Sequence, residues 1–218
     1  MELDTNSGME MVEDPESMQK LYAKTNYVLR EARKAMLKKL EVEDEAALLE
    51  KIKNKQVDEH PAYDHYLSAL ILEQTRLHVR ADMLAQLGGG AGDDGAVVSV
   101  HLILKEQLET HYAHRLSEPV RLAQDALMLS FDSGLLMEVR YFSTEEYMFS
   151  WSWGEAELRI DTAPTHPECQ TFPHHLHGDD GTVRADSVTL PGTDCWTNFS
   201  RLLDVLLVNP LLEPVASA

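Results

Sequence analysis

A change in the spacing of apolar residues constrains the fold of this 218-residue chain more than any other feature. It falls at a glycine-rich segment, GGGAGDDGA, residues 88–96. Before this segment apolar residues recur every three or four positions, which predicts amphipathic helices. After it apolar and polar residues alternate, which predicts strands. Glycine and aspartate at this density cannot continue a helix, so we expect a linker between a helical unit and an α+β domain.

Residues 16–87 are predicted to form two long helices and a short one, folded as an antiparallel hairpin or small bundle. Asp14 and Pro15 suit the start of the first helix, and Pro61 suits the start of the last. A bundle this thin often completes its core against a second copy or another protein, so we expect an interaction module that oligomerises or binds a partner. One helical turn separates His60 from Asp64, where we expect ordinary polar positions.

Residues 97–210 are expected to form the second domain. Predicted strands at 126–131, 135–142, 147–153 and 156–160 would make an antiparallel meander of about four strands. Alternation in YMFSWSW places Phe149, Trp151 and Trp153 on one face of this sheet. A helical segment before the strands and a closing helix over 196–208 would cover it, so the fold class is α+β with helices on one face of the sheet. Residues 1–15 are expected to be a disordered acidic N-terminus, and residues 211–218 a tail.

Composition narrows the partners and the location. The net charge is −18, of which −13 comes from residue 91 onward. Because Lys and Arg supply most of the affinity for a nucleic-acid backbone, broad nucleic-acid binding is disfavoured and only a local RNA contact stays open. Two cysteines suit a reducing compartment, and neither a signal segment nor a membrane-spanning run is present. We therefore expect a cytoplasmic protein without membrane contact.

The segment APTHPECQTFPHHLHGDD, residues 163–180, concentrates four histidines and one cysteine. One hypothesis is a Zn²⁺ site, because imidazole and thiolate suit this ion; its ligands would be His166, Cys169, His174 and His177. A second is acid–base catalysis by adjacent histidines, without a metal or other cofactor, which would allow RNA cleavage. A third is a structural loop held by histidine–carbonyl hydrogen bonds. The cations available to catalysis are Lys105, Arg140, Arg159 and Arg184.

From about residue 132 to residue 206 the chain resembles the TumE-type toxins of toxin–antitoxin pairs. The similarity rests on RIDTAPTHPECQTFPHHLH, residues 159–177, followed by a polar turn and a helix containing LLDVLL. The corresponding family pattern is RxDNAPHHPE…FPHHKH. This chain departs from it at Thr162, Thr165 and Leu176.

The resemblance implies a component of a toxin–antitoxin or defence locus, with an antitoxin or another complex subunit as partner. It implies a histidine-dependent ribonuclease in which Asp161 orients a histidine and Arg159 holds an anionic group. His166 and His175 would exchange protons. The full set of implied site residues is Arg159, Asp161, His166, His174, His175 and His177. The competing hypothesis is a non-enzymatic interaction protein, in which residues 16–87 oligomerise or bind a partner and the histidine segment is structural or metal-stabilised.

Overall fold

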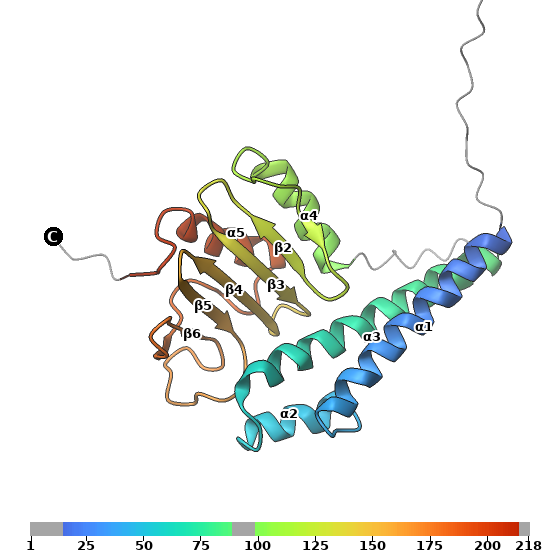
Figure 1. Cartoon of the computed structure of the whole chain (residues 1–218), viewed down its shortest axis with the longest axis horizontal. Helices are drawn as coiled ribbons and strands as arrows, with labels where there is room; N and C mark the ends of the chain where they lie inside the picture. Colours follow the sequence, from blue (N-terminus) through green and yellow to red (C-terminus); the bar gives the residue numbers. More distant parts are fainter. Residues whose placement is uncertain (1–14, 89–98, 214–218) are drawn as a thin grey trace, which may run out of the picture.

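A computed structural model describes residues 15–88 and 99–213, which contain five helices and a seven-stranded sheet (Figure 1). The α+β fold class is confirmed. The expected disordered N-terminus up to residue 14, the linker over 89–96 and the end of the tail, 214–218, lie outside the described residues. No helix in the described part combines the length and the apolar composition needed to cross a bilayer.

The N-terminal helices form the predicted antiparallel hairpin. They are α1 (Pro15–Lys39), α2 (Glu45–Lys53) and α3 (Glu59–Gly88), with α1 lying along α3 and α2 at their connected end (Figure 1). Asp44 caps α2 by accepting a hydrogen bond from the Ala47 amide at 2.8 Å. Arg33 of α1 donates two hydrogen bonds of 2.5 Å to Glu45 of α2, and this bidentate pair fixes the corner of the hairpin.

The sheet is a meander in which each strand pairs antiparallel with the one before it. Its strands are β1 (Arg121–Leu122), β2 (Leu127–Ser130), β3 (Leu136–Tyr141), β4 (Tyr147–Trp153), β5 (Ala156–Asp161), β6 (His175–His177) and β7 (Val183–Ala185). The prediction of about four strands was too low. The missed strands, β1, β6 and β7, are two or three residues long, too short to show alternation. Part of the histidine segment is therefore strand and not loop.

One face of the sheet is covered by α4 (Val100–His111) and α5 (Cys195–Leu206). Phe149 and Trp151 of β4 are buried in this core, and Trp153 packs at its edge, as the alternation predicts. The residues that α5 contributes are those expected from its amphipathic pattern: Phe199, Leu202, Leu203 and Leu206.

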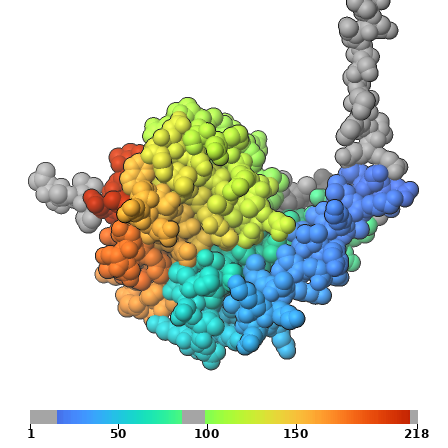
Figure 2. Space-filling view, viewed as in Figure 1, coloured from blue at the N-terminus to red at the C-terminus, as the bar shows by residue number. Residues whose placement is uncertain are grey.

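The opposite face carries α3 at one end. The two flanking helices that were predicted, α4 and α5, do share one face, and the docking of α3 on the other face was not predicted. Met148 of β4 alternates away from the aromatic core and packs with Tyr63 and Leu67 of α3. Further along β4, Ser150 and Ser152 leave this face polar. As a result α3 crosses only the Met148 end of the sheet, and its first turn lies beside the segment that joins β5 to β6 (Figures 1 and 2).

Candidate functional site

Strands β5 and β6 bring four polar side chains to the face of the sheet on which α3 packs. In their register Asp161 lies opposite His175, and Arg159 lies opposite His177. Residues directly opposite each other in neighbouring strands point to the same face. The residue between the two histidines, Leu176, alternates to the other face and is buried in the apolar core. The pairing of these two strands thus separates site residues from core residues.

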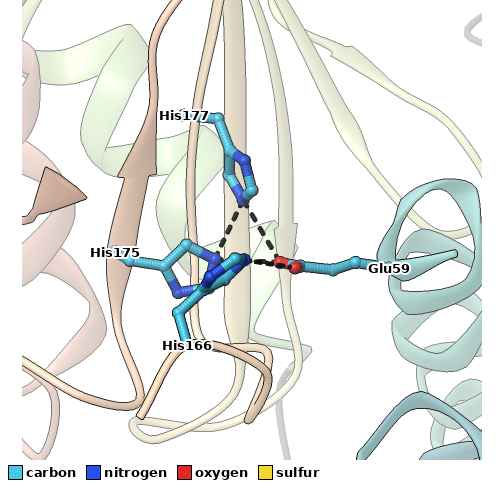
Figure 3. Close-up of side chains that lie close together, drawn as sticks. All are labelled: Glu59, His166, His175 and His177. Atoms are coloured by element: carbon cyan, nitrogen blue, oxygen red, sulfur yellow. Dashed lines mark hydrogen bonds and ion pairs between the residues drawn. The ribbon is translucent and has the colours of Figure 1, made fainter. Parts of the chain in front are cut away.

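Glu59, in the first turn of α3, directs its carboxylate at three histidines of the TumE-type segment (Figure 3). Its Oε1 atom lies 2.8 Å from Nε2 of His175 and 3.2 Å from Nε2 of His177. Its Oε2 atom lies 2.8 Å from Nε2 of His166 and accepts a hydrogen bond of 2.7 Å from the Thr165 hydroxyl. One carboxylate of the N-terminal unit thus contacts three imidazoles of the C-terminal domain.

His60 joins the same cluster. Pro61 keeps it in an extended conformation (φ −110°, ψ 132°), so the regular part of α3 begins beyond these residues. Nε2 of His60 lies 3.1 Å from Oδ2 of Asp161, and Nδ1 lies 3.1 Å from Oδ1 of Asp64. The Arg159 guanidinium contacts both His60 and Asp64. The expectation that His60 and Asp64 are ordinary polar positions is therefore corrected, because α3 docks where β5 and β6 meet.

Opposite charges hold the cluster together. Burial by itself would raise the pKa of the Glu59 and Asp161 carboxyls. Hydrogen bonds from the histidines outweigh this effect and hold both pKa values far below their usual range. Glu59 accepts them from His175, His177 and His60, and Asp161 accepts them from His177 and His60. Burial would lower the pKa of the imidazoles, but their contacts with the carboxylates outweigh burial. The pKa values of His175 and His177 are raised, and the pKa of His60 is raised to about 10. Oδ2 of the fully buried Asp161 faces these rings, 3.1 Å from Nε2 of His60 and 3.5 Å from Nε2 of His177.

Two histidines are oriented from outside the cluster. Nδ1 of His175 donates to the Pro173 carbonyl at 2.9 Å, and Nδ1 of His166 lies 2.9 Å from Oε1 of Glu168. Both rings therefore direct Nε2 inward, an arrangement typical of metal-binding histidines. Two overlapping sets of side chains have ligand atoms close enough to share an ion. They are Glu59, His166, His175 and His177, and Glu59, His60, Asp161 and His177.

Five of the six residues implied as catalytic meet in this cluster: Arg159, Asp161, His166, His175 and His177. His174 does not join them, because it precedes β6 out of phase with the two strand histidines. Its Nδ1 atom is buried and has no hydrogen-bond partner in the described part of the chain. Cys169 also lies outside both sets of potential ligands. The structure thus brings together two members of the predicted Zn²⁺ set, His166 and His177, and not the other two.

An open cleft of about 630 Å³ lies on the same face of the sheet. It extends from Arg121 on β1 to His177 on β6 and is also lined by His60 and Arg159. The side chains of its floor come from alternate positions of β2 to β5: Met128, Ser130, Leu136, Glu138, Ser150, Ser152 and Glu157. Two of the cluster's imidazoles therefore face a space large enough for a small ligand or part of a polymer.

Of the four cations considered for catalysis, only Arg159 reaches the cluster. Arg140 pairs with Asp125 at 3.1 Å and with Glu138 at 2.5 Å. Arg184 donates to the Leu212 carbonyl, and Lys105 pairs with Glu109 on α4. Arg121 lines the far end of the cleft and was not predicted.

The departures from the TumE-type pattern have local explanations. The Thr162 hydroxyl lies 2.9 Å from that of Tyr63, and Thr165 donates to Glu59, so both threonines bond to the N-terminal helices. Leu176 belongs to the core. None of the three removes a member of the observed cluster.

Comparison with known families divides the chain at the same place as the sequence pattern. Residues 9–91 match the family described as Uncharacterized protein MJ0235, and residues 100–205 match the family described as Toxin TumE. The C-terminal part of this chain is a TumE-family domain. The match confirms the resemblance and extends its start from residue 132 to residue 100, so that the TumE domain includes α4. Searches of curated proteins and of solved structures returned no match.

The site of the TumE domain is thus completed by another unit. Glu59, His60 and Asp64 come from the part that matches the MJ0235 family. Sequence reasoning missed Glu59 altogether. The one signal for it is local, a Glu-His-Pro sequence at the start of a helix, and nothing in the sequence connects it with His175, which lies 116 residues away.

Proposed function

We propose that this chain is the toxin of a toxin–antitoxin pair and that the Glu59–histidine cluster is its active site, cleaving RNA phosphodiesters. The observation that carries the proposal is the convergence of four imidazoles and two carboxylates at one end of the cleft in a TumE-family domain. Buried groups of this kind with strongly shifted pKa values gather at catalytic sites more often than elsewhere. An antitoxin protein is the partner that the family implies.

Phosphodiester cleavage requires proton transfer to and from the reacting oxygens and positive charge near the phosphate. His60 and Arg159 face both the cluster and the cleft. We assign proton transfer to His60, whose Nδ1 is held by Asp64, and binding of the phosphate oxygens to Arg159. His166 and His175, expected to exchange protons, are absent from the cleft lining and belong to the inner part of the cluster. That inner part would hold His60 and His177 in place at the end of the cleft.

The charge of the cleft fits a short contact with RNA. Its lining combines two arginines, Arg121 and Arg159, with two glutamates, Glu138 and Glu157. Few phosphates can be neutralised there, so we expect weak dependence of RNA affinity on salt and cleavage of single-stranded segments that fit the cleft. Met128 and Leu136 offer apolar surface to a base.

The test is growth and RNA integrity after induced expression of the full chain in a bacterial host, followed by RNA cleavage with the purified protein. Wild type should arrest growth and cleave RNA. His60→Gln and Arg159→Gln should each lower the cleavage rate at least about 100-fold, the scale of a lost acid–base group. His78→Gln, on the same helix but outside the site, is the matched control. Full activity in His60→Gln, or no RNA cleavage by wild type, would refute the proposal.

A further inference from the structure

The geometry points to a binding site for one divalent transition-metal ion, best suited to Zn²⁺, formed by Glu59, His166, His175 and His177. The inference concerns binding and stands on the structure of the cluster, whether or not the chain cleaves RNA. It differs from the set expected from sequence, which contained Cys169 and His174, and it takes one ligand from α3 and three from the TumE domain.

The separations between these atoms are those of ligands around a common ion. The four ligand atoms all lie within 4.8 Å of one another. Nε2 of His175 lies 2.9 Å from Nε2 of His177, and Glu59 lies 2.8 Å from His166 and from His175. Tetrahedral ligands at the usual Zn²⁺–N distance are separated by about 3.3 Å, so small movements outward would leave room for the ion.

The outer contacts support ligand roles for these side chains. His175 is held through Nδ1 by the Pro173 carbonyl, and His166 through Nδ1 by Glu168. The Thr165 hydroxyl holds one oxygen of Glu59. Metal-binding histidines and carboxylates are regularly fixed by such second partners, which keep the lone pair of the coordinating atom directed at the ion.

The charge of the cluster also favours a cation. Glu59 and the fully buried Asp161 both direct oxygens at the imidazoles: Oε1 of Glu59 lies 2.8 Å from His175, and Oδ2 of Asp161 lies 3.1 Å from His60. Buried carboxylates are stable when they are paired with positive charge or coordinate a metal. A divalent ion beside them would neutralise the two negative charges without requiring adjacent imidazoles to be protonated together.

We infer one ion and not two, because the alternative set, Glu59, His60, Asp161 and His177, shares two of its four members with the first. The Arg159 guanidinium also contacts His60, and this positive charge disfavours a metal ion in the alternative set. The two sets differ in His166 and His60, so substitutions at these positions separate them. An ion in the proposed set joins α3 to the TumE domain and should stabilise their contact.

The experiment uses the full chain, freed of metal with a chelator and titrated with Zn²⁺ by calorimetry. Wild type should bind one Zn²⁺ per chain. His166→Ala, His175→Ala and Glu59→Gln should each weaken binding by about 100-fold or more. Cys169→Ala and His174→Ala are matched controls from the same segment and should bind like wild type, as should His60→Gln. Circular dichroism of each metal-free variant checks its folding.

A second measurement keeps the test decisive where a variant does not fold. Wild type loaded with Co²⁺ should show d–d absorption from nitrogen and oxygen ligands and no thiolate charge-transfer band, because no cysteine belongs to the site. Wild type that binds neither ion at micromolar concentrations would overturn the inference. A thiolate band in wild type together with loss of Zn²⁺ binding in Cys169→Ala would also overturn it. So would loss of Zn²⁺ binding in His60→Gln while His166→Ala binds like wild type. RNA cleavage is measured separately, so the inference and the ribonuclease proposal can fail independently.

Discussion

Replacing Glu59 by glutamine measures how strongly the N-terminal helices are held to the TumE domain. The Glu59 side chain is 13% exposed and contacts Thr165, His166, His175 and His177. Glutamine keeps the shape but removes the charge, so the imidazoles lose their common anionic partner. Breaking a buried ion pair by changing one member costs about 3–5 kcal/mol. We expect the free energy of unfolding to fall by about 3 kcal/mol, the lower end of that range, because the site is partly open to the cleft.

The assay is urea unfolding of the full chain in chelator, so that bound metal is not a variable. Circular dichroism follows the helices, and the fluorescence of Trp151, Trp153 and Trp196 follows the TumE domain. Glu168→Gln is the matched control, because Glu168 contacts His166 but is 65% exposed, so its loss should leave the unfolding midpoint almost unchanged. An unfolding midpoint for Glu59→Gln that stays as close to wild type as that of the control would refute the role of Glu59 in holding the two parts together.

Two further predictions concern the supporting structure. His101 is buried, accepts a hydrogen bond of 3.1 Å from the Tyr141 amide, and has a pKa lowered by burial to about 4. The unfolded chain takes up this proton near pH 6.5 and the folded chain does not, so stability present above pH 6.5 is lost as the pH falls toward 4. We expect the free energy of unfolding of wild type to fall by about 2 kcal/mol between pH 7.5 and pH 5 through this residue, and His101→Gln to lack this part of the fall. Urea unfolding at the two pH values measures it; the same pH dependence in wild type and variant would contradict the prediction. Leu67→Ala removes part of the contact with Met148 and should lower the free energy of unfolding by about 2–5 kcal/mol. Leu77 is half-exposed on the same helix, so Leu77→Ala should lower it by less than about 0.5 kcal/mol. Similar losses in the two variants would argue against the docking of α3 on the sheet.

The fold was largely predictable because its main elements are long enough to show their period. The two long helices carry a stripe over many turns, and β4 alternates over seven residues. The position of α3 on the second face was not predictable. It depends on Met148, one apolar residue on an otherwise polar side of β4, whose partner surface is formed by a distant helix.

The site was predictable in part, for a similar reason. Local composition and the family resemblance both pointed to the histidine segment. The choice among His174, His175 and His177 depends on β6, a three-residue strand between Pro173 and a turn. Glu59 and His60 enter the cluster only through the docking of α3, a tertiary contact that leaves no local pattern. The Zn²⁺ set that included Cys169 assumed ligands from a single loop, whereas the observed cluster is assembled from two units.

We propose one active site shared between the N-terminal helices and the TumE domain. RNA cleavage by purified Glu59→Gln, His175→Ala and His174→Ala, compared at equal concentrations of folded protein, tests it most directly. We expect the Glu59 and His175 variants both to lose cleavage, by about 100-fold or more, while His174→Ala cleaves at the wild-type rate. Wild-type or faster cleavage by Glu59→Gln would contradict it, because Glu59 would then obstruct the site and not complete it.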